Sequence, residues 1–269
     1  MTSRRLDAAL SERGLARSRT HAATLIAAGV VTVDGRPVVK PSTKVDDDQT
    51  IEVAASDHYV SRAAHKLIAA LDRFEVDPAD RVVLDAGAST GGFSQVLLER
   101  GARTVLAVDV GHGQLAAELF GAQGLVLVEG CNVRSLYRAA LASLSGVEEP
   151  ATLVTADLSF ISLTTVLPAL VATAADAADF VLLVKPQFEV GRSGIREGIV
   201  HDAALRSEAV AGVLWAAHDL GVGTAGVMSS PIAGTRGNHE YLVHLTAARG
   251  SNPTEWMRQV ELMTGGEVQ

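Results

Sequence analysis

The sequence predicts an α/β protein whose mainly parallel sheet is buried between helices, preceded by a small α+β domain. Hydrophobic residues make up 48% of the chain but aromatic residues only 4%. This composition favours a parallel sheet covered on both faces over an aromatic-rich β-sandwich. Short apolar stretches also alternate with segments of helical length, as in βαβ units, at residues 82–86, 104–108, 125–128, 152–156 and 180–184.

The last part of the chain changes this pattern. A helix is expected from Ala203 to Leu220, followed by strands at Val222–Val227 and Tyr241–Thr246. Their connection is short for an α/β crossover, so we expect an antiparallel hairpin at the edge of the sheet. These two strands complete a predicted seven-stranded sheet, and a further helix is expected around residues 256–263.

Residues 4–62 have the pattern of a separate module. Two short helices are expected, the first from Leu6 and the second capped by Ser18. Strands follow at 30–33, 37–39 and 50–53, and the dipeptide Asp34-Gly35 is a strong hairpin-turn signal between the first two. We therefore expect a small domain at residues 1–55, a linker at 56–62 and a large domain at 63–269.

The net charge of −8 argues against a nucleic-acid partner until its distribution is considered. Residues 1–40 hold seven basic residues against three acidic ones, so the acidity lies downstream. Charge alone favours a solvated basic face as much as an RNA-binding face. The single cysteine, Cys131, fits a reducing compartment. There is no signal-peptide pattern and no apolar run of membrane-spanning length, so we expect a soluble cytoplasmic protein.

The first module resembles the S4 RNA-binding fold in its order of elements and in its sequence. The likeness is carried by Arg4, Leu6, Asp7, the run Arg13-Gly14-Leu15-Ala16-Arg17-Ser18-Arg19, Leu25-Ile26, Gly29, Val31, Val33-Asp34-Gly35 and Lys40-Pro41. The resemblance implies a module that holds RNA through phosphate contacts and shape rather than by reading bases. The expected RNA contacts are Arg4, Arg5, Arg17, Arg19, Lys40 and Arg62.

A glycine-rich loop, within Val82 to Ser94, joins the first strand of the large domain to a helix. Glycines allow a backbone to approach a ligand and leave helix N–H groups free. A P-loop needs a lysine where Phe93 stands, and Ala88-Ser89 breaks the dinucleotide fingerprint. An S-adenosylmethionine loop remains, typically preceded by an acidic residue such as Asp85, in a Rossmann-like class I methyltransferase domain. The alternative is a tight turn that has a structural role only and binds no ligand.

Two positions beyond this loop support a cofactor site. Asp109 ends the second strand, 24 residues after Asp85, where an acidic residue can bind two ribose hydroxyls. Asn132 follows the third strand, where the adenine ring would lie, although a polar loop there needs no ligand. The predicted cofactor-binding residues are Asp85, Gly87, Ala88, Ser89, Thr90, Gly91, Gly92, Phe93, Asp109, Asn132 and Asp157.

Four charged residues form the predicted catalytic set. Asp157 and Lys185 directly follow the fourth and fifth strands, at the carboxyl ends where open α/β sheets bind ligands. Lys66 lies in the helix before the first strand, and Glu240 starts the last strand. The alternative for Lys185 and Asp157 is a purely structural ion pair.

This combination resembles the Lys-Asp-Lys-Glu tetrad of FtsJ-like ribose 2′-O-methyltransferases, and the whole chain resembles the TlyA (haemolysin A-like) family. Matching sequence recurs at residues 59–62, 84–93, 157–163, 185–191 and 237–241. The pair Ala63-Ala64 departs from the usual glycine-containing pair, which puts inter-domain flexibility in doubt. The resemblance implies transfer of a methyl group from S-adenosylmethionine to cytidine 2′-hydroxyls of 16S and 23S ribosomal RNA, presented as RNA or as ribosomal subunits.

The mechanism can be considered from the residue types alone. A ribose hydroxyl is a poor nucleophile whose proton must be removed, and our hypothesis makes Lys185 the base. Burial and a neighbouring Lys66 favour a neutral Lys185, whereas Asp157 and Glu240 favour its protonated form. The sequence leaves this balance open.

Two other functions stay open in the sequence. The family's second name implies a membrane-active haemolysin, but no spanning helix or strongly amphipathic cationic helix is found. An RNA-binding scaffold with an inactive methyltransferase domain is the other, although the loop and tetrad are intact. The histidines lack metal-ligand spacing and one cysteine cannot complete a zinc site, so no metal is expected. The oligomeric state is not predicted.

Overall fold

The structure is a computed structural model that describes residues 3–265 except 17, 28, 54–57, 192–193 and 235–236. Arg17 and the first two residues of the expected linker, 56 and 57, therefore lie outside the described residues. The chain folds as two compact units, a small one that ends at Arg62 and a large one that begins at Ala63.

The small unit combines two helices with short antiparallel strands. Helices α1 (Leu6–Glu12) and α2 (Arg19–Ala27) pack together, and the strand order β3-β2-β5 forms a three-stranded sheet from Arg36–Pro37, Val31–Val33 and Ile51–Val53. Asp34 and Gly35 both have positive φ, 50° and 74°, as a two-residue type I′ hairpin turn requires. The buried core residues of this unit include Leu6, Leu10, Ile26 and Val31.

One strand pair in the small unit is not predicted by the sequence. Strand β1 (Arg4–Arg5) pairs antiparallel with β4 (Lys44–Val45). Two-residue strands are too short to show an alternating pattern, so nothing in the sequence marked them. Their pairing fixes the start of α1, because Leu6 N and Asp7 N donate to the carbonyl groups of Thr43 and Pro41.

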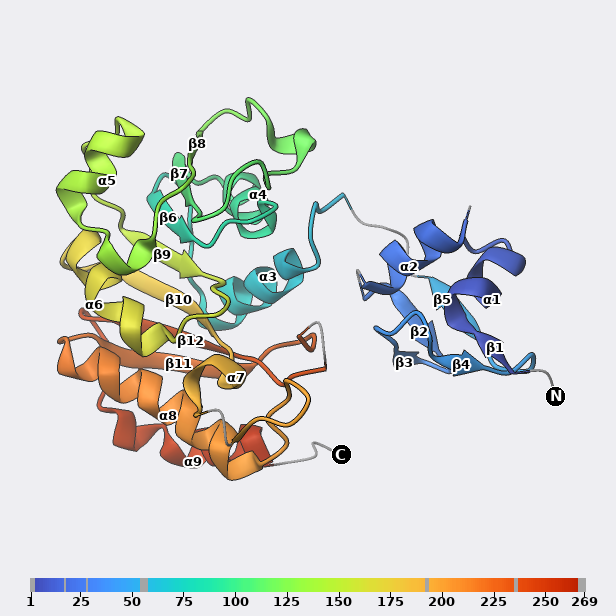
Figure 1. Ribbon diagram of the computed structural model, residues 1–269. Helices are drawn as coiled ribbons and strands as arrows, with labels where there is room; N and C mark the ends of the chain where they lie inside the picture. The colour runs from blue at the N-terminus through green and yellow to red at the C-terminus, as the bar shows by residue number, and fades with distance from the viewer. Residues whose placement is uncertain are drawn as a thin grey trace. The chain divides into compact units, whose positions relative to one another are not determined.

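The large unit contains a seven-stranded sheet in the order β11-β12-β10-β9-β6-β7-β8 (Figure 1). The five strands β10, β9, β6, β7 and β8 are mutually parallel, and β12 and β11 run antiparallel to their neighbours. Their bounds are β6 Val82–Ala86, β7 Thr104–Val108, β8 Leu125–Val128, β9 Leu153–Ala156, β10 Asp179–Val184, β11 Gly223–Ser229 and β12 Tyr241–Thr246. The predicted α/β class with a mainly parallel seven-stranded sheet is confirmed.

The last two strands form an antiparallel pair at the edge of the sheet, as predicted. Strand β12 lies between β10 and β11, so β11 alone forms this edge of the sheet. The segment between β11 and β12 is also longer than the two to five residues of a tight hairpin, because it runs from Ser230 to Glu240. Glu240 is therefore placed beside an interior strand of the sheet.

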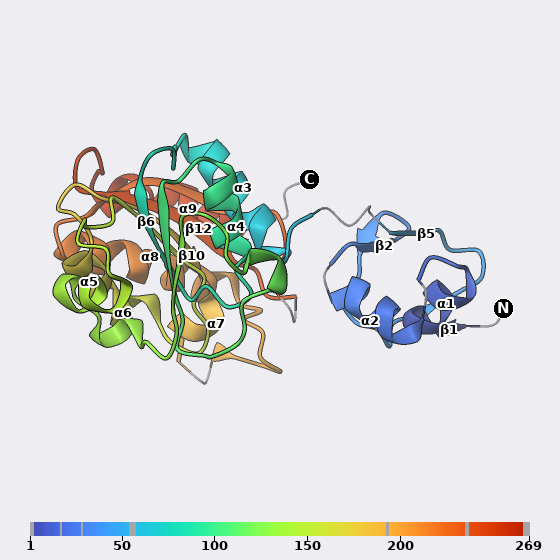
Figure 2. The ribbon, with the colours of Figure 1, turned by 90° about the horizontal axis from the view of Figure 1, so that it is seen from above.

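Helices cover both faces of the sheet (Figure 2). Helices α3 and α4 pack on one face, and α5, α6 and α8 pack on the other, with α9 against α8 and β11. Successive side chains of a strand point to opposite faces of the sheet. Because helices cover both faces, both sets of side chains are buried, and the strand sequences are apolar throughout. The helix bounds are α3 Ala63–Phe74, α4 Gly92–Glu99, α5 Arg138–Ser145, α6 Leu163–Thr173, α7 Pro186–Glu189, α8 Ala203–Asp219 and α9 Met257–Gly265.

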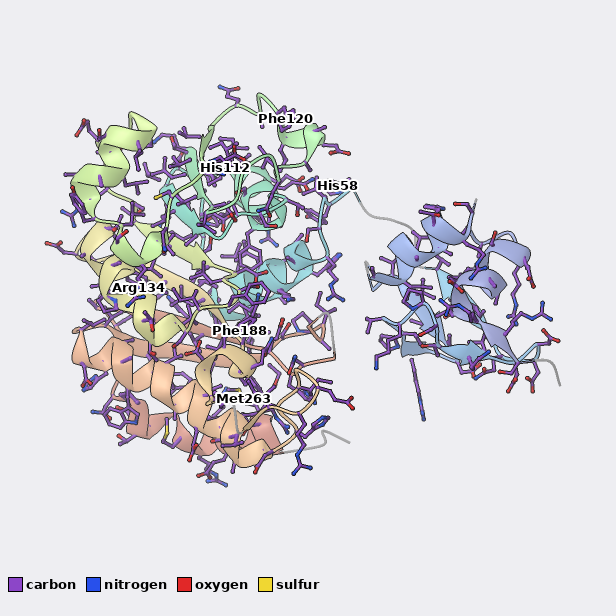
Figure 3. All side chains as sticks on the ribbon, viewed as in Figure 1. His58, His112, Phe120, Arg134, Phe188 and Met263 are labelled. Atoms are coloured by element: carbon purple, nitrogen blue, oxygen red, sulfur yellow. The ribbon has the colours of Figure 1, made fainter. Side chains whose placement is uncertain are left out.

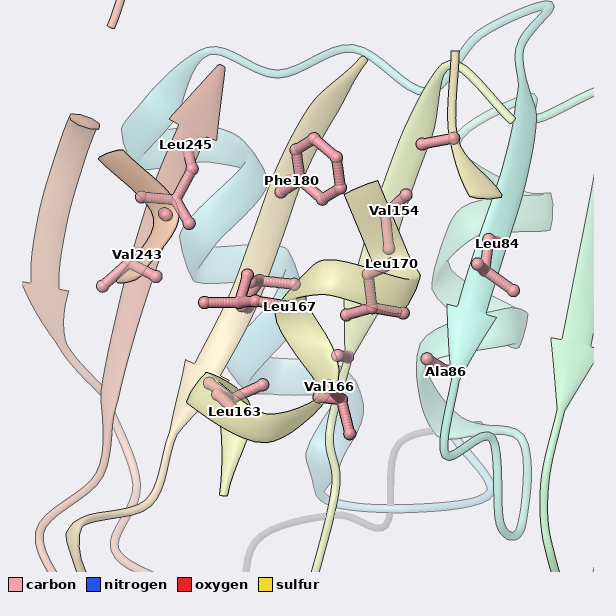
Figure 4. Close-up of a cluster of buried hydrophobic side chains, with 14 of the residues drawn as sticks. Leu84, Ala86, Val154, Leu163, Val166, Leu167, Leu170, Phe180, Val243 and Leu245 are labelled. Carbon is pink, nitrogen blue, oxygen red and sulfur yellow. The ribbon is translucent and has the colours of Figure 1, made fainter. Parts of the chain in front are cut away.

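The larger hydrophobic cluster lies between the sheet and α6 (Figure 4). Leu163, Val166, Leu167 and Leu170 occupy one side of α6, and all four are buried. They pack over side chains of β6, β9, β10 and β12 that point to the same face. This packing holds the amino end of α6 close to the carboxyl ends of the strands. None of the helices in the described ranges is long and apolar enough to cross a bilayer.

Truncation of Leu167 tests this packing. Leu167 is 1% exposed, whereas Leu144 on α5 is 59% exposed. We expect Leu167→Ala to lower the free energy of unfolding by about 2–5 kcal/mol, because it removes buried methyl groups and leaves a cavity. The matched change Leu144→Ala should cost about 0.5 kcal/mol or less. Urea denaturation of both variants measures the difference, and equal losses would contradict the assigned core.

Candidate active site

A cavity of about 580 Å³ opens at the carboxyl ends of the parallel strands. Its walls come from the segments that follow β6, β7, β8 and β9, within residues 87–89, 108–114, 131–133 and 157–161. The strand order reverses between β6 and β9, and open α/β sheets bind ligands at such a point. The volume lies within the range of small-molecule sites.

The structure distributes the predicted cofactor residues between the cavity and the scaffold beneath it. Five of them line the cavity: Gly87, Ser89, Asp109, Asn132 and Asp157. The other six are not among its lining residues: Asp85, Ala88, Thr90, Gly91, Gly92 and Phe93. Most of these six residues are buried in β6, in the loop or at the start of α4, and they shape the loop.

Gly87 explains why the loop after β6 needs a glycine. Its φ is +82°, and a Cβ at this position would lie 2.9 Å from Leu158 Cδ2 and 3.0 Å from the carbonyl oxygen of Asp157. A side chain would therefore separate the loops after β6 and β9. Glycine allows the two loops to meet and leaves the cavity open above them.

Asp109 lies on the cavity wall at the end of β7. Its Oδ2 accepts a hydrogen bond from Ser89 N at 2.8 Å, and its Oδ1 accepts one from Gly111 N at 2.7 Å. Each carboxylate oxygen has a second lone pair, so the group can also accept hydrogen bonds from a ligand diol. Gln114, which the sequence analysis missed, lines the same wall and accepts a hydrogen bond from Ser89 Oγ. No sequence pattern marked it.

Asn132 and Cys131 form the opposite wall after β8. Asn132 Oδ1 accepts a hydrogen bond from Arg134 N at 3.0 Å, which fixes the side chain at the start of a 3₁₀ turn. Burial raises the pKa of the Cys131 thiol, so the group stays neutral. Together they provide a small, mixed polar and apolar surface.

Asp85 is fully buried under the loop and does not line the cavity. Burial raises the pKa of its carboxyl group to about 6, although hydrogen bonds from Ser94 and Thr155 act in the opposite direction. Ser94 Oγ donates to Oδ2 at 2.6 Å, and Thr155 Oγ1 donates to Oδ1 at 3.0 Å. The carboxyl group thus joins β6 to the start of α4 and to β9.

Two ion pairs bring the predicted catalytic residues together, and Lys66, Lys185 and Glu240 in them are buried. Lys185 Nζ lies 2.5 Å from Asp157 Oδ1, and Lys66 Nζ lies 2.5 Å from Glu240 Oε2. Val184 faces Tyr241 in the antiparallel β10–β12 pair, so Lys185 and Glu240 are the next residues along that register. The two pairs therefore occupy neighbouring positions at the same end of the sheet. Lys185 Nζ also donates to Ser159 Oγ at 3.0 Å.

A further carboxylate, missed by the sequence analysis, links the loops that carry Asp157 and Lys185. Glu189 is the last residue of the short helix α7, which begins directly after Lys185. Its Oε1 accepts a hydrogen bond from Leu163 N at 2.8 Å. Its Oε2 accepts one from Ser162 Oγ at 2.5 Å. Burial raises the pKa of the Glu189 carboxyl group. Glu189 therefore satisfies free donors at the start of α6 from the opposite loop.

The same two loops carry an aromatic pair. Phe160 and Phe188 have ring centroids 5.4 Å apart, and Figure 3 labels Phe188 on α7. Phe160 is 92% exposed and has a φ of +65°, an uncommon conformation for a residue with a bulky side chain. Phe160 lines the cavity and lies three residues after Asp157 in the sequence. An exposed ring in this place can stack on a planar group.

In the small unit, Asp7 holds two of the arginines that were predicted to bind RNA. Arg5 Nη2 lies 2.9 Å and Arg19 Nη2 3.3 Å from Asp7 Oδ2. The hydrogen bond from Arg5 is the largest cause that lowers the pKa of Asp7 to about 2. The Arg19 side chain is still 61% exposed, so it can reach a further anion.

The other predicted RNA contacts differ in their surroundings. Arg4 forms ion pairs with Glu12 and Asp47. Lys40 is exposed, and Arg62 lies close to Gly29. The structure therefore leaves these cations on the surface of the small unit, with Arg4 partly engaged within the unit. Across the described residues of the whole chain, no three His, Cys, Asp or Glu side chains gather as a metal site.

Comparison with known proteins identifies the family. A model of FtsJ-like methyltransferases matches residues 59–247, and a model of the S4 domain matches residues 4–51. The 16S/23S rRNA (cytidine-2′-O)-methyltransferase TlyA of Mycobacterium tuberculosis is 50% identical over 244 residues, which cover 90% of this chain and 89% of that protein. The chain belongs to the TlyA family. This confirms the predicted FtsJ-like and S4 domains.

Two further likenesses extend over most of the chain. Hemolysin A of Brachyspira hyodysenteriae is 36% identical over 241 residues, 89% of this chain and 98% of that protein. A solved structure of a proposed hemolysin from Streptococcus thermophilus is 35% identical, with a TM-score of 0.74, and covers 98% of this chain and 96% of that one. Family membership also confirms the predicted enzyme class, an S-adenosylmethionine-dependent methyltransferase.

Replacement of Asp85 tests its buried carboxyl group. A carboxyl group whose pKa is raised on folding stabilises the fold below its ordinary pKa near 4, and this stability is lost as pH rises through about 6. Relative to Asp85→Asn, the wild type should therefore lose about 3 kcal/mol of unfolding free energy between pH 4 and pH 7. Denaturant titrations across this range measure the difference. A difference that does not change with pH would contradict the buried carboxyl group.

Glu189→Ala tests the link between the two loops. We expect the methyl-transfer rate constant to fall roughly tenfold to a hundredfold, since small displacements of reacting groups reduce rates strongly. S-adenosylmethionine affinity should stay within about twofold, because Glu189 does not line the cavity. Single-turnover assays and calorimetry measure the two quantities. Glu208→Ala on α8, an exposed carboxylate, is the control, and an unchanged rate constant in Glu189→Ala would disprove the link.

Proposed function

We propose that this TlyA family member transfers a methyl group from S-adenosylmethionine to the 2′-hydroxyl of cytidine in 16S and 23S ribosomal RNA. The observation that carries the proposal is the pair of largely buried ion pairs, Lys185–Asp157 and Lys66–Glu240, next to the cavity. Buried charges are costly, and they cluster at functional sites. The name of the Mycobacterium tuberculosis relative supports the cytidine and both ribosomal RNAs.

The cavity fits the methyl donor. Asp109 has free acceptor positions for the two ribose hydroxyls, and the Gly87 backbone leaves room that a Cβ would fill. Cys131 and Asn132 offer a mixed wall for the adenine ring, and Asp157 borders the other end. We assign these residues and Ser89 to the donor. The remaining predicted residues, Asp85, Ala88, Thr90, Gly91, Gly92 and Phe93, are assigned to the shape of the loop. When bound, S-adenosylmethionine supplies an electrophilic methyl group.

We assign the role of general base to Lys185. In its neutral form Lys185 would accept the proton of the 2′-hydroxyl at Nζ as the oxygen attacks the methyl group, because it is the buried amine nearest the wall formed by Asp157 and Ser159. Nζ is protonated after the transfer, and Asp157 orients the amine and stabilises the charge that it then carries. Glu240 holds Lys66, whose positive charge stabilises negative charge that develops on the attacking oxygen.

The RNA would be held by both units. The S4 domain supplies Arg5, Arg19 and Lys40 for phosphate contacts, to which we add Arg4, Arg17 and Arg62. The exposed ring of Phe160 gives the target base a stacking surface beside the cavity. Because the proposed substrate is ribosomal RNA, free or in ribosomal subunits, we propose that the protein acts in the cytoplasm.

Lys185→Ala tests the base. We expect the methyl-transfer rate constant to fall roughly 10²–10⁴-fold, the usual contribution of a positioned general base. Affinity for S-adenosylmethionine, measured by calorimetry, should stay near normal, since Lys185 does not line the cavity. Lys44→Ala, an exposed lysine of the small unit, is the control. Near-normal methylation by Lys185→Ala would remove Lys185 from the role of base.

Mapping of 2′-O-methyl groups in ribosomal RNA tests the function itself. Cells with the wild-type protein should carry cytidine 2′-O-methyl groups in both ribosomal RNAs that cells with Lys185→Ala lack. Absence of any difference, together with normal cofactor binding, would favour an RNA-binding scaffold. A liposome-leakage assay of the purified protein addresses membrane activity, and leakage at low protein concentration would favour a haemolysin.

A further inference from the structure

A second cavity, of about 480 Å³, lies in the large unit beside β11. Figure 1 labels this strand, which forms one edge of the sheet. We call this cavity the edge cavity. Its lining comes from the end of α3, from β11 and β12, and from the segment between Arg249 and Gln259. Gly226 faces His244 on β12, which in turn faces Val181 near the start of β10. Lys185 follows the other end of β10, so the edge cavity is remote from the proposed site of methyl transfer.

The backbone of β11 is irregular where it forms the cavity wall. The pairing register with β12 shifts between Thr224 and Gly226, which leaves Ala225 as an extra residue in the strand. Such bulges re-aim side chains and are frequent next to binding sites. Gly226 is required here, because a Cβ would lie 2.6 Å from the Phe74 ring of α3. Ala225 and Gly226 both line the cavity.

One polar group in this wall lacks a partner. The Oγ1 atom of Thr224 is buried and makes no hydrogen bond with the described residues, while the backbone of Thr224 is bonded to Ser251. An unsatisfied buried hydroxyl costs about 1–3 kcal/mol, so native proteins seldom keep one without a function or a bound group. Thr224 lines the edge cavity, but its hydroxyl is covered in the structure. A ligand would provide the missing hydrogen bond after a small rearrangement of the lining side chains.

Two arginines give the edge cavity a positive charge. Arg73, at the end of α3, and Arg249, after β12, both line it and are exposed, and neither forms an ion pair within the described residues. Glu75 is the acidic side chain among the described lining residues, so the arginines exceed it by one charge. Guanidinium groups match phosphate oxygens in geometry and are weakly hydrated, which favours phosphate binding.

Aromatic and amide groups complete the lining. Trp256 is half-buried and donates from Nε1 to Ser251 Oγ at 2.9 Å, so its ring is held in place. Gln259 donates to the Val227 carbonyl group and lies at the same wall. Fixed aromatic rings beside arginines are the combination that binds a nucleobase together with its phosphate.

We propose that the edge cavity binds a nucleoside phosphate, either free or as part of an RNA strand. Arg73 and Arg249 bind the phosphate, Trp256 lies against the base, and the Thr224 hydroxyl completes its hydrogen bonding with the ligand. The site contains no residue of the catalytic set or of the donor cavity. It therefore adds a second nucleotide-binding site to the methyltransferase domain.

Calorimetry on the full chain tests this site, with saturating S-adenosylmethionine so that the first cavity is filled. The probes are cytidine monophosphate and a short single-stranded RNA. Wild-type protein should bind at least one of them, and Arg73→Ala/Arg249→Ala should bind it at least about tenfold more weakly, because charged hydrogen bonds are lost. Arg258→Ala, on the exposed side of α9, is the matched control and should bind normally.

The variant Thr224→Val distinguishes an effect on ligand binding from an effect on folding stability. It should weaken binding of the same probe about fivefold or more, while its stability without ligand stays equal to or above that of the wild type, because an unsatisfied hydroxyl is removed. Weakened binding of cytidine monophosphate identifies a free nucleotide as the ligand. If only RNA binding weakens, with a reduced salt dependence, the ligand is an RNA strand. Equal binding of both probes by wild type and the double variant would overturn the proposal, as would no binding.

Discussion

The need to pair charges that are buried at the end of a parallel sheet governs the arrangement of the large unit. Lys66, Lys185 and Glu240 are each less than 10% exposed, and a buried charge without a partner is strongly destabilising. Each lysine therefore has to meet a carboxylate from another element. Lys66 comes from α3 and Glu240 from the start of β12, while Asp157 and Lys185 follow β9 and β10. The position of β12 inside the sheet, rather than at its edge, satisfies this requirement.

Much of the fold and of the site followed from local sequence. The five parallel strands are nearly continuous apolar runs, because helices cover both faces of the sheet, and such runs are visible without any knowledge of contacts. Asp157 and Lys185 could be identified because each directly follows such an apolar run. The S4-like unit was also accessible, since the Asp34-Gly35 turn has the two positive φ angles that its dipeptide predicts.

What the sequence could not predict depends on contacts between distant segments. Glu189 and Gln114 carry no motif, and their roles arise only when neighbouring loops meet. Asp85 shows the opposite difficulty, because the motif marks it but burial places it under the loop rather than in the cavity. The β1–β4 pair was too short to leave a periodic signal. The edge cavity likewise depends on a register shift that residue types do not encode.

The Lys66–Glu240 ion pair joins residues 174 positions apart in the chain. A chain that ends before residue 240 lacks Glu240 and the antiparallel partner of β10. In that state Lys66 has no carboxylate, and β10 has an open edge where β12 belongs. Contacts of such long sequence separation form late in folding, because a long loop must close first. The proposed catalytic set is therefore complete only after the chain has been made as far as Glu240.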